Sequence, residues 1–309
     1  MSILLVATNR DMVPHRDKLL ELDPNLDVEI WPDVKDRDRI TFIVAWSQPA
    51  NLLGQFPNLK VVASMGAGVE HLMEDDSIPD DVKITRLVSS HIQVQIVDFI
   101  ESCCYQFIRR ITDYVEQQRK AEWKVLPHAL KEERNVGILG LGHLGAATAE
   151  KLAANGWIVN GWSRSTKQIP GCISYAGPDQ LAEFLSKTNI LVNLLPLTPE
   201  TEGILNLELF KQLKQPACLI NTGRGQHLVE EDLIYALDRN LLKEAYLDVF
   251  ETEPLPASHP FWNRPAIRVT PHIASLTYPE ELAGQTIDNY KRLMSGQPLL
   301  YVVDREKGY

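Results

Sequence analysis

The chain has 309 residues, of which 44% are hydrophobic and 23% charged, and its formal net charge is −10. A single hydrophobic core seldom grows beyond about 250–300 residues, so the length favours two domains. The ordinary composition argues against a disordered, collagenous or coiled-coil chain. The acidic excess argues against nucleic acid and anionic membrane surfaces as partners, because both require clustered cations.

The N-terminal segment and the cysteines indicate the cellular compartment. Residues 1–10 lack the basic region of a signal peptide, and no apolar run approaches the ~20 residues of a membrane span. The cysteines, none of them in a CxxC pair, are Cys103, Cys104, Cys172 and Cys218. We therefore expect a reduced cytoplasmic protein without a disulfide framework or a metal site.

In the first third of the chain, short apolar runs alternate with turn or helical segments, which is typical of an α/β domain. The predicted strands are residues 2–8, 27–31, 41–46, 60–64 and 83–88. Together they predict a small parallel sheet.

A long stretch without glycine or proline follows, over residues 91–126. Its apolar residues recur at three- and four-residue spacing from Ile92 to Val115, which predicts one face of a long helix. Such a helix could connect two domains and serve as a dimer arm. An ordinary core helix remains an equal alternative.

A second series of strands and crossover helices predicts a doubly wound sheet. The strands are residues 135–139, 157–161, 190–195, 217–221, 244–249 and 267–270, and the helices are residues 143–155, 178–187, 206–214 and 230–239. A last helix at 279–294 needs a surface to pack on, and we expect it to return to the first domain. The predicted domains are therefore residues 1–98 with 277–309 and, inserted between them, residues 99–276.

The turn after strand 135–139 has the pattern of a dinucleotide-binding site. It contains G-x-G-x-x-G, with Gly140, Gly142 and Gly145 around His143 and Leu144, between a strand and a helix. The glycines permit a tight turn, a close approach of the backbone to a pyrophosphate, and close helix–strand packing. The helix N-terminus supplies free N–H groups. An accidental glycine-rich turn is the alternative.

The next strand indicates which dinucleotide is bound. A carboxylate normally ends this strand and binds the ribose 2′-hydroxyl. Here Ser163, Arg164 and Ser165 follow the strand, and residues 157–167 contain no carboxylate. Arginine and serine would bind a 2′-phosphate that a carboxylate would repel, which predicts a preference for NADPH. Alternatively, Arg164 is a solvated loop residue and NAD(H) is accepted too.

Three polar residues follow late strands, where an open α/β sheet places its ligands. They are Arg224, between two glycines, Glu253 and His272. Reduction of a 2-keto acid needs a cationic clamp for the carboxylate and a proton for the new alkoxide. Arginine suits the first task and histidine the second, while a carboxylate beside the histidine favours its charged form and fixes its tautomer. Each residue alone could be structural.

The chain resembles the D-isomer-specific 2-hydroxyacid dehydrogenases over its whole length, and among them most closely the glyoxylate and hydroxypyruvate reductases. The resemblance rests on the motifs GILGLGHLG (137–145), WSR (162–164), NLLPLTPET (193–201), NTGRG (221–225), LDVFETEPLP (247–256), TPHIAS (270–275) and the terminal VDREKGY. It implies a flavodoxin-like substrate domain, an inserted Rossmann cofactor domain and a homodimer. Arg224, Glu253 and His272 match the catalytic arginine, glutamate and histidine of the family.

The resemblance also implies roles that spacing alone does not assign. Met65, Gly66, Ala67 and Gly68 match the loop whose backbone N–H groups bind the substrate carboxylate, together with Arg224 and His272, and Trp46 matches an aromatic wall of the substrate pocket. The remaining implied cofactor contacts are Leu195, Pro196, Thr201, Thr222, Gly223, Arg224 and Asp248. Met65–Gly68 could instead be an ordinary turn, and Asp248 could equally be a buried structural residue.

The implied activity is NADPH-dependent reduction of small 2-keto acids such as glyoxylate, to glycolate, and hydroxypyruvate, to D-glycerate. An alternative is an NAD(H)-sensing interaction protein like the corepressor branch of the family, which keeps the three catalytic residues. Formate dehydrogenase shares the architecture but has glutamine before its histidine, whereas Pro271 stands here. Gly223 replaces the alanine common in the family, and we expect no change in chemistry from it.

Overall fold

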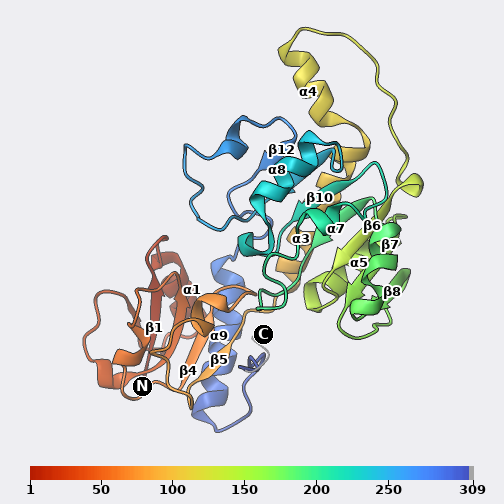
Figure 1. Cartoon of the computed structure of the whole chain (residues 1–309). Helices are drawn as coiled ribbons and strands as arrows, with labels where there is room; N and C mark the ends of the chain where they lie inside the picture. The colour runs from red at the N-terminus through yellow and green to blue at the C-terminus, as the bar shows by residue number, and fades with distance from the viewer. Residues whose placement is uncertain (306–309) are drawn as a thin grey trace. The chain divides into compact units, whose positions relative to one another are not determined.

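The computed structural model describes residues 1–305, which divide into two compact units (Figure 1). The first unit comprises residues 1–92 and 276–305, and the second comprises residues 93–275. Within the described residues, no helix is long and apolar enough to cross a membrane.

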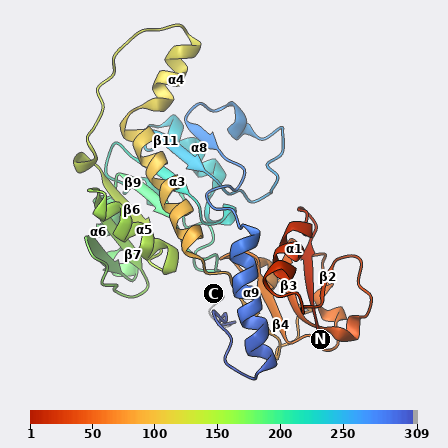
Figure 2. The same ribbon diagram turned by 180° about the vertical axis from the view of Figure 1, so that it is seen from behind.

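The first unit is built on a five-stranded parallel sheet in the order β2-β1-β3-β4-β5, the order of flavodoxin. Its strands are β1 (Ser2–Ala7), β2 (Val28–Ile30), β3 (Ile40–Trp46), β4 (Val61–Ser64) and β5 (Lys83–Thr85), and its helices are α1 (Val13–Leu22), α2 (Glu70–Met73) and α9 (Pro279–Met294). The strands are apolar on both faces because helices cover the sheet. Helix α9 packs against α1, from the other end of the chain, as both views show (Figures 1 and 2).

The segment after α9 also belongs to the first unit. Val302 forms an antiparallel bridge with Thr85 of β5, and the Val303 N–H donates to the Ile84 carbonyl at 2.9 Å. The last helix therefore returns to the first sheet, and the second unit is an insertion. Of the terminal motif VDREKGY, residues 306–309 lie outside the described residues.

The second unit is built on a seven-stranded parallel sheet in the order β12-β11-β10-β9-β6-β7-β8. Its strands are β6 (Asn135–Leu139), β7 (Ile158–Ser163), β8 (Cys172–Ala176), β9 (Ile190–Asn193), β10 (Cys218–Asn221), β11 (Glu244–Leu247) and β12 (Ile267–Val269). This is the Rossmann order with one strand added beside β11. The predicted fold class, two doubly wound parallel sheets with an inserted Rossmann domain, is confirmed.

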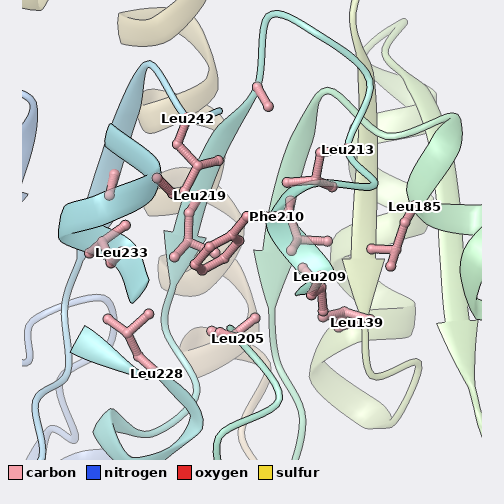
Figure 3. Close-up of a cluster of buried hydrophobic side chains, with 14 of the residues drawn as sticks. Leu139, Leu185, Leu205, Leu209, Phe210, Leu213, Leu219, Leu228, Leu233 and Leu242 are labelled. Carbon is pink, nitrogen blue, oxygen red and sulfur yellow. The ribbon is translucent and has the colours of Figure 1, made fainter. Parts of the chain in front are cut away.

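Helices of the second unit pack on both faces of this sheet. The helices of this unit are α3 (Ser90–Ile108), which begins at the end of the first unit, α4 (Ile111–Arg119), which protrudes from the unit, α5 (His143–Ala154), α6 (Leu181–Ser186), α7 (Leu207–Phe210) and α8 (Glu230–Asp238). On one face Phe210 of α7 and Leu233 of α8 lie beside Leu219 of β10, in a cluster of leucine side chains (Figure 3). Packing of this kind fixes the strand ends on which the candidate site is built.

The prediction of a single long helix over residues 91–126 is wrong. Helix α3 ends at Ile108, Arg110 adopts a left-handed φ of +58°, and α4 ends at Arg119. The break lets the Thr112 hydroxyl donate to the buried Glu244 carboxylate at 2.8 Å. Residues 120–125 are all exposed, so no burial stabilises a longer helix there.

The sequence also missed strand β8, Cys172–Ala176, at the edge of the second sheet. Its exposed Ile173 and buried Tyr175 alternate as in a strand with one covered face. Only five residues carry this pattern. So short an alternation inside a polar stretch gives a weak signal.

Candidate active site

The turn between β6 and α5 carries the three glycines predicted to approach a dinucleotide. Gly140 has a φ of +96°, and a Cβ there would lie 2.7 Å from the Leu194 carbonyl oxygen. A Cβ at Gly145 would lie 1.8 Å from the Gly140 carbonyl oxygen. At Gly142, by contrast, a Cβ would meet nothing within 4 Å. The turn is thus packed against protein at its first and third glycines and open at the second.

Helix α5 begins directly after this open glycine. His143 and Leu144 form its first turn, where backbone N–H groups have no partner within the helix. The His143 Nε2 atom lies 2.5 Å from Gln93 Nε2 of α3, and Gly142 caps the helix with no side chain of its own. Unpaired N–H groups beside open space suit a pyrophosphate.

The segment after β7 contains the residues predicted to bind a 2′-phosphate. Ser163 is half-buried and its hydroxyl donates to the Ser165 carbonyl at 2.8 Å, while Arg164 and Ser165 are exposed. No carboxylate occurs between residues 157 and 167. The exposed face of this segment is therefore formed by hydroxyl and guanidinium groups.

The segment after β9 is held by its own side chains. The Thr201 hydroxyl donates to the Pro196 carbonyl at 2.7 Å and accepts from the Thr198 N–H at 2.9 Å, and Leu195 is buried. A hydrogen bond from Thr198 lowers the pKa of Glu200, and the charge of Arg164 lowers it further. This segment and the Ser163–Ser165 segment therefore lie close together, as two parts of one cofactor site would.

Glu253 and His272 form a hydrogen-bonded pair. His272 Nδ1 lies 2.8 Å from Glu253 Oε2, and Glu253 Oε1 accepts the Phe250 N–H at 2.9 Å. Burial, the largest influence, raises the pKa of Glu253, but the bond and charge of His272, the Phe250 N–H and the charge of Arg224 together lower it below its usual range. Glu253 is therefore a stable carboxylate beside the imidazole, and Arg224 lies near it.

Asp248 anchors the loop that carries His272. His272 has a left-handed φ of +55°, which costs a residue other than glycine free energy, and its N–H donates to the Asp248 carbonyl at 2.9 Å. The buried Asp248 carboxylate accepts the Thr270 hydroxyl at 2.6 Å and the N–H groups of Ile273 and Ala274 at 2.8 Å each. These bonds support the structural interpretation of Asp248.

Arg224 lies in a turn between β10 and the short helix Gly225–His227. Thr222 and Gly223, which precede it, are buried, and Arg224 Nη1 donates to the Gly223 carbonyl at 2.7 Å. A Cβ at Gly225 would lie 1.9 Å from the Phe250 carbonyl carbon. The Arg224 turn is therefore packed directly against the loop that carries Glu253.

In the first unit, residues 65–68 follow β4 as a tightly fixed loop. The Gly66 N–H donates to Ser64 Oγ at 3.2 Å, the Ser64 hydroxyl donates to the Gly68 carbonyl at 2.7 Å, and Thr277 donates to the Met65 carbonyl at 2.9 Å. Within residues 1–305 the N–H groups of Ala67 and Gly68 have no acceptor. A fixed loop with two free N–H donors suits a carboxylate.

Trp46 ends β3 and packs on this loop. A Cβ at Gly66 would lie 2.9 Å from the Trp46 ring, so glycine is required for the contact. His71 meets the same ring edge-on at 4.7 Å, and the Arg10 guanidinium lies 5.7 Å from its centroid. Trp46 is thus fixed beside the loop of residues 65–68, and the Arg10 guanidinium lies against its ring.

Sequence reasoning missed a buried polar cluster below the Arg224 turn, formed by Asn193, Asn221 and His227. Two of its members are the last residues of β9 and β10, where asparagine ends an otherwise apolar run. That position was the available signal. In the described part of the chain, no group of three or more His, Cys, Asp or Glu residues could hold a metal ion.

Comparison with known proteins identifies the family. A family model described as "D-isomer specific 2-hydroxyacid dehydrogenase, NAD binding domain" matches residues 102–274. The chain belongs to the D-isomer specific 2-hydroxyacid dehydrogenases. Similar members are the glyoxylate/hydroxypyruvate reductase A of Photorhabdus laumondii subsp. laumondii, 39% identical over 291 residues and 93% of both chains, and that of Escherichia fergusonii, 38% identical over 314 residues and all of both chains.

Solved structures of this dehydrogenase family are similar over the whole chain. A D-isomer specific 2-hydroxyacid dehydrogenase from Xanthobacter autotrophicus Py2, in complex with NADPH and MES, has a TM-score of 0.94 and 37% identity and covers 100% of this chain and 99% of its own. An NADPH-dependent glyoxylate/hydroxypyruvate reductase from Sinorhizobium meliloti, in complex with NADP and sulfate, has a TM-score of 0.94 and 36% identity and covers 100% of both chains. The family resemblance predicted from the motifs is confirmed.

Proposed function

We propose that this dehydrogenase reduces small 2-keto acids, such as glyoxylate and hydroxypyruvate, with NADPH. The observation that carries the proposal is the Glu253–His272 pair at 2.8 Å with the charge of Arg224 beside it. This group lies in the unit that also holds the glycine-rich turn. The names of the relatives, glyoxylate/hydroxypyruvate reductase A, support the substrate class.

The residues of the second unit fit NADP(H). The open turn at Gly142 and the first N–H groups of α5 would hold the pyrophosphate, and Ser163, Arg164 and Ser165 would hold the 2′-phosphate. When bound, the cofactor supplies the hydride that is added to C2 of the keto acid. The similar structures in complex with NADPH and NADP support this preference, and we propose NAD(H) as a weaker second cofactor.

Arg224 would bind the keto acid, and His272 would protonate it. The Arg224 guanidinium would bind the substrate carboxylate and polarise the keto oxygen. Because His272 Nδ1 is bonded to Glu253, its Nε2 is the atom that would donate a proton to the alkoxide oxygen. Glu253 would stabilise the charged imidazole before that transfer and remain a carboxylate throughout.

The first unit would recognise the substrate. The free N–H groups of Ala67 and Gly68 would bind the carboxylate, and Trp46, fixed on Gly66, would be a wall of the pocket. Asp248 would act through the His272 loop, since its carboxylate accepts three bonds from that segment.

The test is a keto-acid panel with the purified protein. Glyoxylate, hydroxypyruvate, pyruvate and a bulkier keto acid are each mixed with NADPH and, separately, with NADH, and kcat/KM is measured from the loss of reduced cofactor. We expect the highest values for the small acids with NADPH. Binding of cofactor without turnover of any keto acid would contradict the proposal and favour the sensing role.

We further propose a homodimer in the cytoplasm. The loop after α4 exposes apolar side chains, with Trp123 100% and Val125 85% accessible, and both views show α4 and this loop protruding from the second unit (Figures 1 and 2). A second copy of the chain would cover them. Sedimentation of the protein and of Trp123→Asp tests this, with a dimer expected for the first and a monomer for the second. The four free cysteines suit a reducing compartment.

A further inference from the structure

A fully buried polar cluster lies beneath the Arg224 turn and has no part in the reaction proposed above. Asn193 ends β9, Asn221 ends β10, and His227 ends the short helix after Arg224; all three side chains are completely inaccessible to solvent. Burial of so many polar groups is costly unless each is hydrogen-bonded. The hydrogen-bond partners of these side chains therefore identify the backbone segments that the cluster fixes in place.

His227 is bonded through both ring nitrogens. Its Nδ1 lies 3.0 Å from the Arg224 backbone nitrogen and 2.9 Å from Asn193 Nδ2, and both of these groups are donors. Nδ1 must therefore accept and carry no proton. The ring proton lies on Nε2, which donates to the Pro196 carbonyl at 3.3 Å. One tautomer satisfies all three contacts.

The two asparagines complete the cluster. Asn193 Nδ2 also donates to Asn221 Oδ1 at 3.0 Å, while Asn221 Nδ2 donates to the Arg224 carbonyl at 3.1 Å. Both the N–H and the carbonyl of Arg224 are thus bonded to buried side chains. A Cβ at Gly223 would lie 2.6 Å from Asn193 Nδ2, so the cluster also packs tightly against this residue of the turn.

We propose that His227 is a positioning residue that aligns two parts of the active site through opposite ring atoms. Through Nδ1 it fixes the backbone of Arg224, and through Nε2 it fixes Pro196 in the predicted cofactor segment. The inference rests on the proposed role of Arg224 in binding the keto acid. The printed contacts of both ring nitrogens are to protein atoms, so His227 is a positioning residue that acts through these segments.

Two substitutions separate the ring atoms. An asparagine amide ends near the position of Nδ1, and a glutamine amide reaches the position of Nε2. His227→Asn therefore keeps an acceptor for the Arg224 N–H and loses the bond to Pro196. His227→Gln keeps a donor for Pro196 and loses the acceptor at Arg224. The pair is matched because both side chains are neutral amides.

The readouts are kcat/KM for glyoxylate and the Kd of NADPH, measured for both variants by turnover and by fluorescence. His227→Gln should lower kcat/KM by about 10- to 100-fold, because Arg224 would be displaced from the substrate carboxylate. It should leave the Kd of NADPH within about twofold. His227→Asn should leave kcat/KM within about threefold and weaken NADPH by about fivefold, the loss of one hydrogen bond. The control is His259→Gln. The His259 ring is bonded to Glu230 and to the Phe261 N–H, not to Arg224 or Pro196, so this substitution should change neither kcat/KM nor the Kd of NADPH.

Two kinetic results would overturn the proposal, and one NMR result would do the same. Equal losses in both readouts for both variants would mean that the ring merely fills the core, and wild-type values for both would mean that it positions nothing. If neither variant folds, as judged by circular dichroism, nitrogen NMR of the wild-type imidazoles decides, with the His227 signal assigned by selective labelling. A proton on Nε2 supports the proposal and a proton on Nδ1 refutes it.

The NMR and cofactor measurements need no keto acid. If the wild-type protein reduces no keto acid, the proposed function is contradicted. The NMR and cofactor measurements would still test the two hydrogen bonds of His227.

Discussion

The two units present their candidate site residues in different ways. The second unit presents three side chains, each fixed by a hydrogen bond: Arg224 to the Gly223 carbonyl, Glu253 to the Phe250 N–H, and His272 to Glu253. The first unit presents the backbone N–H groups of Ala67 and Gly68 on a loop fixed by Ser64. Both sites follow strands of a parallel sheet, where open α/β folds bind ligands.

The difference follows from the two tasks. A proton donor works only in one tautomer and one charge state, so the His272 ring needs a carboxylate partner and an anchored loop. A carboxylate group of a substrate needs only donors at the correct spacing, which a loop of small residues such as Gly66 and Gly68 supplies without any titratable group. The second unit should therefore control the rate of the chemical step and the cofactor choice, while the first should contribute to substrate affinity alone.

Removal of the His272 imidazole is the strongest test of this division. His272→Ala should lower kcat with glyoxylate and NADPH by about 10²–10⁴-fold, because the alkoxide loses its proton donor. NADPH affinity, measured by fluorescence, should change little. His259→Ala removes another imidazole that is paired with a glutamate in the same unit, at 3.0 Å from Glu230, and should keep full activity. Near-normal turnover of the His272 variant would remove this residue from the mechanism.

Charge reversal at Arg164 should have the next largest effect. Arg164→Asp removes the predicted partner of the 2′-phosphate and supplies the carboxylate that binds a ribose hydroxyl. The ratio of kcat/KM for NADPH to that for NADH should fall by about 10- to 100-fold, which is the range for one or two charge-assisted hydrogen bonds. Arg239→Asp changes the net charge equally outside the predicted cofactor segments and is the control. An unchanged ratio would contradict the phosphate site.

Trp46 tests the first unit separately. Trp46→Ala removes the ring that packs on Gly66 and should lower kcat/KM for glyoxylate by about tenfold, mainly through KM, since substrate affinity is affected more than chemistry. NADPH affinity should not change, and Trp46→Phe should recover most of the loss. A fall in kcat with unchanged KM would mean that the ring serves the chemical step.

Patterns with local causes were predictable from the sequence. The apolar strands, the Gly140–Gly145 turn and the absence of a carboxylate after β7 all follow from residue types within one short segment. The grouping of Arg224 with Glu253 followed from their positions after late strands of the predicted doubly wound sheet, and the family resemblance then assigned their roles. For the His227 cluster the sequence offered one signal, the asparagines that end β9 and β10. Their association with His227 was not predictable, because the three residues come from separate segments that meet only in the folded chain.

The break between α3 and α4 shows the same limit. Apolar spacing continued through Ile111 and Val115, so the local pattern favoured an unbroken helix. The contact that competes with it, Thr112 to Glu244 at 2.8 Å, joins residues far apart in the chain. Periodicity within one segment contains no information about such a partner.

Glu244 itself gives the smallest predicted effect, on stability alone. Burial raises the pKa of this carboxyl, although the Tyr246 and Thr112 hydroxyls, which donate to Oε2 at 2.7 Å and 2.8 Å, oppose the shift. A carboxyl whose pKa is higher in the folded than in the unfolded protein contributes stability at a pH below its unfolded-state pKa. This contribution is lost as the pH rises through the folded-state pKa. Glu244→Gln should therefore stabilise the protein by about 1 kcal/mol at pH 8 and change it little near pH 4. Urea unfolding at both pH values measures this, and Glu230→Gln, on a half-buried carboxylate, is the control; an equal gain at both pH values would mean that the charge of Glu244 is not the cause.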